Sequence, residues 1–340
     1  MLRVGIVGAR GFTGEELIKI LIKHPGVRLT YLAATLERPE DIGDIFPSLR
    51  SVVALKCEPF SIAKAAEKCD LLFLALPHTV SMQVAPKLIK KGKKIVDLSA
   101  DYRLKNPAVY EQWYHKTHKD PVNLKKFIYG LPELNRERIR GASLVANPGC
   151  YPTAAIIACA PALATGIAEK EGIIIDAKSG VSGAGKKLSK DYLYLSVNEN
   201  FRGYKFNVHQ HSPEINQELS RLSLARVDVV FCPHLLPVNR GILETIYIRL
   251  KKATSGEKVE EIYRKFYKTE PFVRVRGLNK LPELADVTGT NFCDIGLVVD
   301  ERKKLLIVTS VIDNLLKGAS GQAVENMNLM CGFDEKTALV

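Results

Sequence analysis

Residues 2–14 read LRVGIVGARGFTG, and they predict how the first part of the chain folds. The apolar run of residues 2–8 predicts a buried strand, and the spacing of apolar residues over 15–23 predicts a helix. The three glycines between them permit a tight turn and a close approach of backbone to a pyrophosphate, which the helix N-terminus also attracts. The stretch therefore predicts a dinucleotide-binding turn, whose cofactor-binding residues are Gly8, Arg10, Gly11, Phe12, Thr13 and Gly14.

The end of the second predicted strand, residues 27–34, indicates which dinucleotide binds. An NAD site usually carries an acidic residue there, which holds the ribose hydroxyls. Here the place holds Thr35 and Arg38, with Glu37 beside them. Thr35 and Arg38 suit a 2′-phosphate, and Arg10 could assist. We therefore predict NADP as the cofactor.

Strands alternate with helices over the first 100 residues. Apolar runs at 70–76 and 94–98 predict strands, and residues 80–91 predict a helix between them. This alternation implies a parallel sheet with right-handed crossovers. Residues 101–146 are rich in prolines and charges, so we interpret them as a long connection with short helices.

The pattern changes after residue 150 to that of a second domain. Residues 153–164 are apolar and alanine-rich, which predicts a buried helix that Pro161 can kink. Residues 318–330 are again helical and could return to the first domain. Between them we predict a strand at 172–177, a loop at 179–185, a helix from about Pro213, strands at 227–232, 243–250 and 305–313, and a helix at 257–267.

The composition fits a two-domain enzyme, with 340 residues of which 46% are hydrophobic and 25% charged. No apolar run approaches the roughly 18 residues that span a bilayer, and the start resembles no cleavable signal, so we expect a cytoplasmic protein without membrane contact. The net charge of +12 suits anionic ligands such as nucleotides and phosphorylated metabolites. No zinc finger, RNA-binding aromatic motif or basic tail indicates nucleic acid.

One of the seven cysteines has an unusual setting. Their scatter, without a C-x-x-C pair, argues against a zinc site and against a disulfide framework. Cys150 follows Asn147-Pro148-Gly149, which forces a turn directly before a helix. A thiol at a helix N-terminus gains from the dipole and from nearby N–H groups, which favour the thiolate. We therefore predict Cys150 as a nucleophile and most of the other cysteines as small buried side chains.

Two histidines in His209-Gln210-His211, before a helix near Pro213, could supply a general acid and base for cysteine chemistry. His-x-His is also a metal-ligand spacing, but no cysteine or carboxylate cluster completes a tetrahedral set, and we predict no metal. At least one of the two histidines is expected to be structural.

Two arginines stand near predicted strand ends, where loops often carry function. Arg103 lies in the stretch 97–103, and Arg240 lies in the stretch 236–241. Either guanidinium could grip a carboxylate or phosphate with two hydrogen bonds. We take both as candidate substrate-binding residues.

Together these motifs resemble those of the N-acetyl-gamma-glutamyl-phosphate reductases of arginine biosynthesis, nearly throughout the chain and in the family's order. The cysteine motif and the paired-histidine motif are specific, whereas the glycine turn is not. The family commonly has His-Arg-His where this chain has Gln210. The matching stretches are 7–14, Leu76-Pro77-His78, 97–103, Asn147-Pro148-Gly149-Cys150-Tyr151-Pro152-Thr153, 179–185, 209–214 and 318–323.

The resemblance implies an α/β fold with two domains. An N-terminal Rossmann NADP-binding domain would comprise residues 1–148 with 314–340. An α+β catalytic and dimerisation domain of the semialdehyde dehydrogenase type would comprise 149–313. A homodimer or homotetramer would follow.

The resemblance also implies the reaction. The Cys150 thiolate attacks an acyl phosphate, phosphate leaves, and NADPH reduces the thioester, which releases N-acetylglutamate semialdehyde. His211 would be the general acid and base, and Glu214 would orient its imidazole. His209 would be the alternative residue for this proton transfer. Further cofactor contacts would come from Pro77, Ser182, Gly183, Gly185 and Asn314.

Two other functions fit parts of the sequence. A sister reductase in lysine biosynthesis would act on glutamyl or aminoadipyl phosphate attached to an acidic carrier protein, which the positive charge would suit. A non-catalytic NADP-binding sensor with Cys150 as a redox switch would keep the glycine turn, but it would need neither the histidine pair nor the 179–185 loop.

Overall fold

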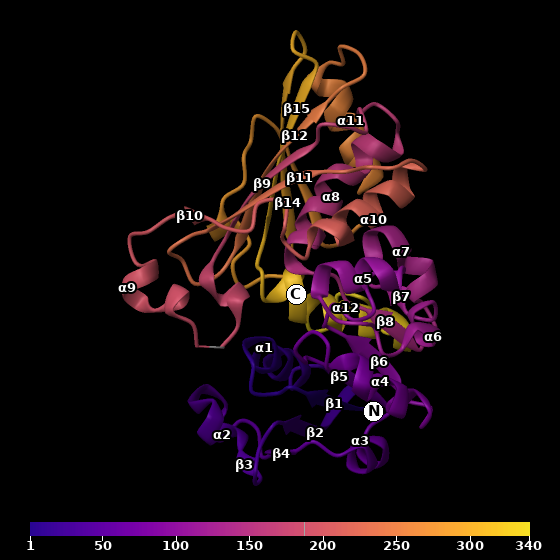
Figure 1. Ribbon diagram of the computed structural model, residues 1–340, viewed down its shortest axis with the longest axis vertical. Helices are drawn as coiled ribbons and strands as arrows, with labels where there is room; N and C mark the ends of the chain where they lie inside the picture. Colours follow the sequence, from indigo (N-terminus) through magenta and orange to yellow (C-terminus); the bar gives the residue numbers. More distant parts are fainter. Residues whose placement is uncertain (187) are drawn as a thin grey trace. The chain divides into compact units, whose positions relative to one another are not determined.

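The computed structural model describes residues 1–186 and 188–340 and divides them into two compact units (Figure 1). Unit 1 comprises Met1–Pro148 and Ala319–Val340, and unit 2 comprises Gly149–Gly318. The sequence placed the return to the first unit between residues 313 and 314, five residues too early. Residues 314–318 stay with unit 2 because the Asn314 side chain bonds there, where its Oδ1 accepts the N–H of Gly241 at 2.7 Å.

Unit 1 is built on an eight-stranded sheet in the order β3-β4-β2-β1-β5-β6-β8-β7. Every neighbouring pair is parallel except β3 with β4. The strands are β1 Leu2–Val7, β2 Val27–Ala34, β3 Glu40–Asp41, β4 Lys56–Pro59, β5 Leu71–Leu74, β6 Lys94–Asp97, β7 Ile128–Tyr129 and β8 Leu144–Ala146. The predicted parallel α/β sheet is confirmed, and its strand carboxyl ends form the edge where such folds bind ligands.

The helices of unit 1 connect these strands. The first, α1, begins at Phe12, directly after the glycine turn, and α12 returns from the end of the chain to pack against α1, α7 and β6. The helices are α1 Phe12–Leu21, α2 Ile42–Ile45, α3 Ile62–Lys68, α4 Ser81–Ile89, α5 Pro107–Tyr114, α6 Pro121–Leu124, α7 Pro132–Ile139 and α12 Gly321–Cys331.

The stretch 101–146 holds three short helices, as predicted, but it also supplies two strands that the sequence did not indicate. β8 is three residues long and β7 two, which is too short for an alternating pattern to be recognised. β8 pairs with β6 and brings Asn147, at its carboxyl end, beside Asp97. The long connection therefore completes the sheet.

Unit 2 is built on a seven-stranded mixed sheet in the order β10-β11-β9-β12-β15-β14-β13. β9 is parallel to β11 and β13 to β14, whereas the other pairs are antiparallel. The predicted strand at 227–232 begins three residues later, and β13 and β14 were missed. The strands are β9 Ile174–Ser179, β10 Arg202–Gly203, β11 Val230–Leu235, β12 Ile242–Arg249, β13 Val273–Leu278, β14 Cys293–Asp300 and β15 Leu305–Ile312.

Helices cover one face of this sheet (Figure 1). They are α8 Cys150–Ala164, α10 Ser212–Ser223 and α11 Gly256–Phe266. A further short helix, α9 Tyr194–Val197, lies in the connection between β9 and β10. Nearly all of α8 is buried, which accounts for its alanine-rich sequence. In β12 every second residue is buried and those between are half-buried, so the side chains on the opposite face of the sheet are less covered.

Within the described residues, no helix is long and apolar enough to cross a membrane.

Candidate active site

Cys150 is the first residue of α8, as the sequence predicted. Gly149 precedes it with extended backbone (φ −69°, ψ 157°), so the chain turns sharply into the helix. The side chain is partly exposed, whereas Cys57, Cys69, Cys159 and Cys293 are buried. The first-turn N–H groups and the dipole of a 15-residue helix favour negative charge on this sulfur.

Five of the other six cysteines have surroundings that disfavour a thiolate. Burial raises the pKa of the Cys57 thiol to about 11. Burial likewise raises the thiol pKa of Cys69, Cys159, Cys232 and Cys331. This contrast supports Cys150 as the reactive thiol.

Glu214 is tied to the turn that precedes Cys150. It lies in the first turn of α10, is 1% exposed, and its Oε1 accepts the N–H of Gly149 at 2.9 Å. A buried carboxylate that accepts a backbone N–H fixes the peptide plane it bonds. The sequence had assigned Glu214 to orienting His211, and it did not indicate this bond to Gly149.

The two histidines lie against each other, with ring centroids 4.8 Å apart. The backbone N–H of His211 donates to Nδ1 of His209 at 3.1 Å. Nδ1 of His209 is therefore an acceptor, and a neutral His209 carries its proton on Nε2. This gives His209 a structural task and favours His211 for proton transfer.

The two candidate substrate arginines lie in different units. Arg240, in unit 2, pairs with the fully buried Asp313, with Nε 3.1 Å from Oδ2. Arg103, in unit 1, is 4% exposed and donates from Nε to the carbonyl of Asn147 and from Nη2 to that of Leu98, both at 2.7 Å. Arg103 thus holds the backbone ahead of Cys150, a role that its sequence setting did not reveal.

The glycine turn of unit 1 has the shape that a pyrophosphate needs. Gly8 has φ +97°, and a Cβ there would lie 2.1 Å from the carbonyl oxygen of Ala75, so only glycine fits. A Cβ on Gly14 would lie 2.6 Å from the oxygen of Ala9. At Gly11 the nearest atom would be 3.7 Å away, so space is open above the turn.

The start of α1 completes this cradle. Its N-cap is Gly11, and among the described side chains none caps the helix by a hydrogen bond. The positive end of the helix dipole lies at this turn and attracts an anion. Ser320 donates from its hydroxyl to the carbonyl of Thr13 at 3.0 Å, which fixes the turn against the segment leading into α12. The residues present fit a dinucleotide phosphate.

Arg10 and Thr35 follow the adjacent strands β1 and β2 and are exposed, as is Arg38. The N–H groups of Gly8 and Ala9 both donate to the carbonyl of Ala33, which joins the ends of the two strands. Nη2 of Arg10 lies 3.9 Å from Oε2 of Glu40.

A buried polar network follows β5 and β6. Burial and the neighbouring Asp101 raise the pKa of the Asp97 carboxyl to about 7, and the hydroxyls of Ser81 and Ser99 donate to it. Asp101 accepts the N–H groups of Thr79 and Met82 at 2.7 and 2.9 Å, which caps α4.

The same network holds the loop after Pro77. Nδ1 of His78 accepts the N–H of Ala100 at 3.0 Å, and burial, aided by the charge of Arg103, lowers the pKa of His78 to about 4. His78 is thus neutral. The sequence did not indicate that Asp97 and Asp101 hold this loop.

The predicted cofactor residues of unit 2 lie together. Asn314 is 2% exposed and donates from Nδ2 to the hydroxyl of Ser182 at 2.9 Å. A Cβ on Gly183 would meet only ordinary contacts, and one on Gly185 would meet nothing within 4 Å. Asn314 therefore holds the loop in place, and Gly185 faces open space.

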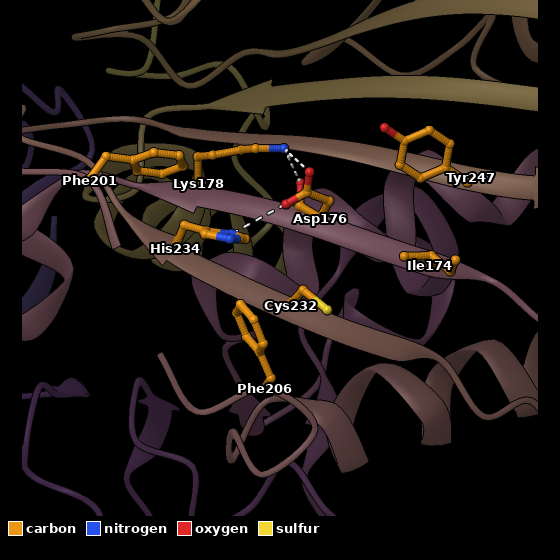
Figure 2. Close-up of a pocket in the computed structure, with 8 residues that line it drawn as sticks. All are labelled: Ile174, Asp176, Lys178, Phe201, Phe206, Cys232, His234 and Tyr247. Carbon is orange, nitrogen blue, oxygen red and sulfur yellow. Dashed lines mark hydrogen bonds and ion pairs between the residues drawn. The ribbon is translucent and has the colours of Figure 1, made fainter. Parts of the chain in front are cut away.

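A separate hollow of about 400 Å³ lies on the sheet face that α8 does not cover (Figure 2). Lys178 and His234 both pair with Asp176, at 2.6 and 3.3 Å, and Figure 2 shows Phe201 and Phe206 near them. Its lining comes from β9, β11, β12 and the segment between α9 and α10: Ile174, Asp176, Lys178, Phe201, Phe206, Cys232, His234 and Tyr247. Cys150 is not among these residues.

Comparison with known proteins gives the family. Residues 3–142 match the semialdehyde dehydrogenase NAD binding domain, and residues 150–314 match the semialdehyde dehydrogenase dimerisation domain. These matches support a nicotinamide cofactor and a homo-oligomer.

Full-length relatives and solved structures agree. The chain is 50% identical over 340 residues to the N-acetyl-gamma-glutamyl-phosphate reductase of Geobacter sulfurreducens, covering 100% of this chain and 98% of that protein. It is 48% identical to the reductase of the same name from Desulforudis audaxviator, with the same coverage.

The aspartate semialdehyde dehydrogenase II of Vibrio cholerae has the same fold, with a TM-score of 0.72 at 17% identity over 97% of this chain and 98% of that one. The Candida albicans enzyme of that class, solved with NADP, also has a TM-score of 0.72, at 15% identity over 99% of both chains. Given these full-length matches, the chain belongs to the N-acetyl-gamma-glutamyl-phosphate reductase family, within the semialdehyde dehydrogenase fold.

Proposed function

We propose that this chain reduces N-acetyl-gamma-glutamyl phosphate to N-acetylglutamate 5-semialdehyde, with release of phosphate, in arginine biosynthesis. The observation that carries the proposal is the setting of Cys150 at the start of α8. The names of its full-length relatives agree with it.

The chemistry at Cys150 follows from the nature of its sulfur. The thiol proton passes to His211, and the sulfur attacks the acyl carbon. The bond from that carbon to the phosphate oxygen breaks, so phosphate leaves and a thioester remains on Cys150. The glycine turn would hold a nicotinamide cofactor, whose chemistry would be hydride transfer to the thioester carbon. The carbonyl oxygen would then carry a negative charge. As the C–S bond breaks, this oxygen re-forms the carbonyl of the released aldehyde, and His211 returns its proton to the sulfur.

NADP is the proposed cofactor. Arg10 and Thr35 are exposed at the ends of neighbouring parallel strands, and Arg38 is exposed three residues further on. A guanidinium suits a phosphate because it offers several donors in a fixed plane. Pro77, Ser182, Gly183, Gly185 and Asn314 remain the further candidate cofactor contacts. Arg240 and Arg103 remain the candidate substrate ligands.

The homo-oligomer is proposed to be a dimer, or a tetramer built from such dimers. The less covered face of the unit 2 sheet carries aromatic and apolar side chains around the hollow of Figure 2, including Phe206 and Tyr247. Burying such a face against a second copy removes apolar area from water. Two identical faces meet in an isologous dimer.

A cytoplasmic location is proposed because a catalytic thiolate needs a reducing compartment. The seven cysteines are all free thiols, which fits such a compartment.

The proposed function is tested with Cys150→Ser. The variant should lose essentially all phosphate-dependent reduction of NADP by the semialdehyde, because a serine hydroxyl at this position is a far weaker nucleophile than a thiolate. Calorimetry should find NADP binding unchanged. Cys331→Ser, the same change at another partly exposed cysteine, should keep full activity.

Retained turnover in Cys150→Ser would rule out covalent catalysis. Offering the acyl phosphate free and attached to an acidic carrier protein separates the proposed substrate from the carrier-bound alternative. We expect turnover of the free form.

A further inference from the structure

An aromatic cluster in unit 2 surrounds the two histidines. Tyr151 follows Cys150 directly in α8, and its ring centroid lies 5.6 Å from that of His209 and 5.9 Å from that of His211. The ring planes are inclined by 84° and 68°, the edge-to-face arrangement that aromatic rings prefer. One side chain, covalently next to the nucleophile, therefore contacts both imidazoles.

Tyr204 closes the cluster from the segment ahead of the histidines. Its ring lies 5.7 Å from His209, and its backbone N–H donates to the carbonyl of Pro233 in β11 at 3.0 Å. Its hydroxyl oxygen lies 3.0 Å from that of Tyr151. His209 is thus packed by both tyrosines, while a hydrogen bond joins the two phenols.

Both phenol hydroxyls of this contact are protonated. Burial raises the pKa of both phenols well above the ordinary value, so they keep their protons. The contact between the two hydroxyls therefore joins the start of α8 to the segment before the histidines.

We propose that Tyr204 and Tyr151 are positioning residues that act as a pair and hold the imidazoles of His209 and His211 in place for proton transfer at Cys150. The pair acts through the histidines. A tyrosine ring fixed at its backbone alone can tilt, whereas the contact between hydroxyls pins its far end. The proposal rests on the proposed function, because the orientation of the imidazoles matters only if a proton moves at Cys150.

The test uses tyrosine-to-phenylalanine changes in the full-length chain, which remove one hydroxyl and keep the ring. Tyr204→Phe and Tyr151→Phe should each lower kcat about tenfold, because small misplacement of catalytic groups is costly. KM should change less than about twofold, since the tyrosines do not hold the substrate. The double variant should resemble either single variant, because one change already removes the contact.

A second readout separates positioning from stability. The pH dependence of Cys150 alkylation by iodoacetamide should move to higher pH in Tyr204→Phe, because a misplaced imidazole no longer supports the thiolate. Tyr194→Phe is the control, because it makes the same change at a 75% exposed tyrosine between β9 and α10. It should match the parent in kcat, melting temperature and the pH profile of alkylation.

Full kcat in Tyr204→Phe would overturn the proposal. A double variant whose loss of kcat is the product of the two single losses would also overturn it. So would a loss of kcat that accompanies a lower melting temperature while the pH profile of Cys150 alkylation stays unchanged. These outcomes are distinct from failure of the proposed function, which would appear as turnover by Cys150→Ser.

Discussion

Glu214 and Arg103 act on the backbone that leads into Cys150. Glu214 accepts the N–H of Gly149, and Arg103 donates to the carbonyl of Asn147. Both side chains are nearly fully buried, where hydrogen bonds to charged groups are strong. They fix the peptide groups on either side of Pro148, so the helix N-terminus is set before any ligand arrives.

We expect Arg10 and Arg38 to determine the preference of the protein for NADPH over NADH. Arg10→Ala and Arg38→Ala should each lower kcat/KM for NADPH about tenfold or more and leave that for NADH nearly unchanged, because only NADPH carries the 2′-phosphate. Steady-state assays with both cofactors measure this. An equal loss with both would assign the arginine to the shared pyrophosphate or to stability.

At the scale of single residues, the sequence predicted the special position of Cys150 because a Pro-Gly turn before a helix is a local signal. It could not predict that Glu214 bonds to Gly149, 65 positions away. It also missed the aspartates of the Asp97–Asp101 network, because their burial depends on how β5, β6 and α4 meet.

The turn between β1 and α1 is the element that the glycine pattern describes best. Its three glycines have different physical tasks. Gly8 is required by its positive φ and by the carbonyl of Ala75, and Gly14 by the carbonyl of Ala9, whereas Gly11 faces open space. The fold requires the first two glycines, and we propose that the third leaves room for the cofactor phosphate.

Gly11→Ala and Gly8→Ala should therefore behave differently. Gly11→Ala should keep the melting temperature within about 2 °C and weaken NADPH binding at least tenfold, because its methyl group occupies space meant for phosphate. Gly8→Ala should lower the melting temperature, because the Cβ cannot be placed without moving backbone. Thermal melts and calorimetric titration measure both. Unchanged NADPH affinity in Gly11→Ala would place the pyrophosphate elsewhere.

Among the elements, long periodic segments were predictable and short ones were not. The strand at residues 27–34 was predicted with its observed bounds because it is eight residues long and apolar at its end. β7 and β8, with two and three residues, carry no period, and they are strands only because β6 lies alongside. β14 was missed because its glycine and two aspartates weaken an otherwise apolar run.

At the level of the whole molecule, the core of unit 2 contains an ionisable side chain. Glu244 of β12 is fully buried, and within the described residues neither carboxyl oxygen has a hydrogen-bond partner. Burial raises the pKa of its carboxyl well above 4.5, so the folded protein favours the neutral acid. The unfolded chain ionises near 4.5, so this group's contribution to stability is fully present below that pH.

Stability should therefore fall as pH rises from about 4.5 toward the raised folded pKa of Glu244, at about 1.4 kcal/mol per pH unit for this one group. Glu244→Gln keeps the shape and cannot ionise. It should match the parent near pH 4.5 and be more stable at pH 8, as measured by urea unfolding. A difference between the two that does not change with pH would contradict the protonated state.

A thioester on Cys150 should accumulate when the enzyme turns over in the oxidative direction without phosphate. The enzyme is mixed with N-acetylglutamate 5-semialdehyde and NADP, and NADPH absorbance is followed before acid quenching and peptide mass analysis. We predict a burst of one NADPH per subunit and an N-acetylglutamyl group on the peptide that contains Cys150, released when phosphate is added. The opposite result is steady turnover after phosphate is added, without a burst or an adduct at Cys150 before the addition. That result would show that no thioester forms on Cys150.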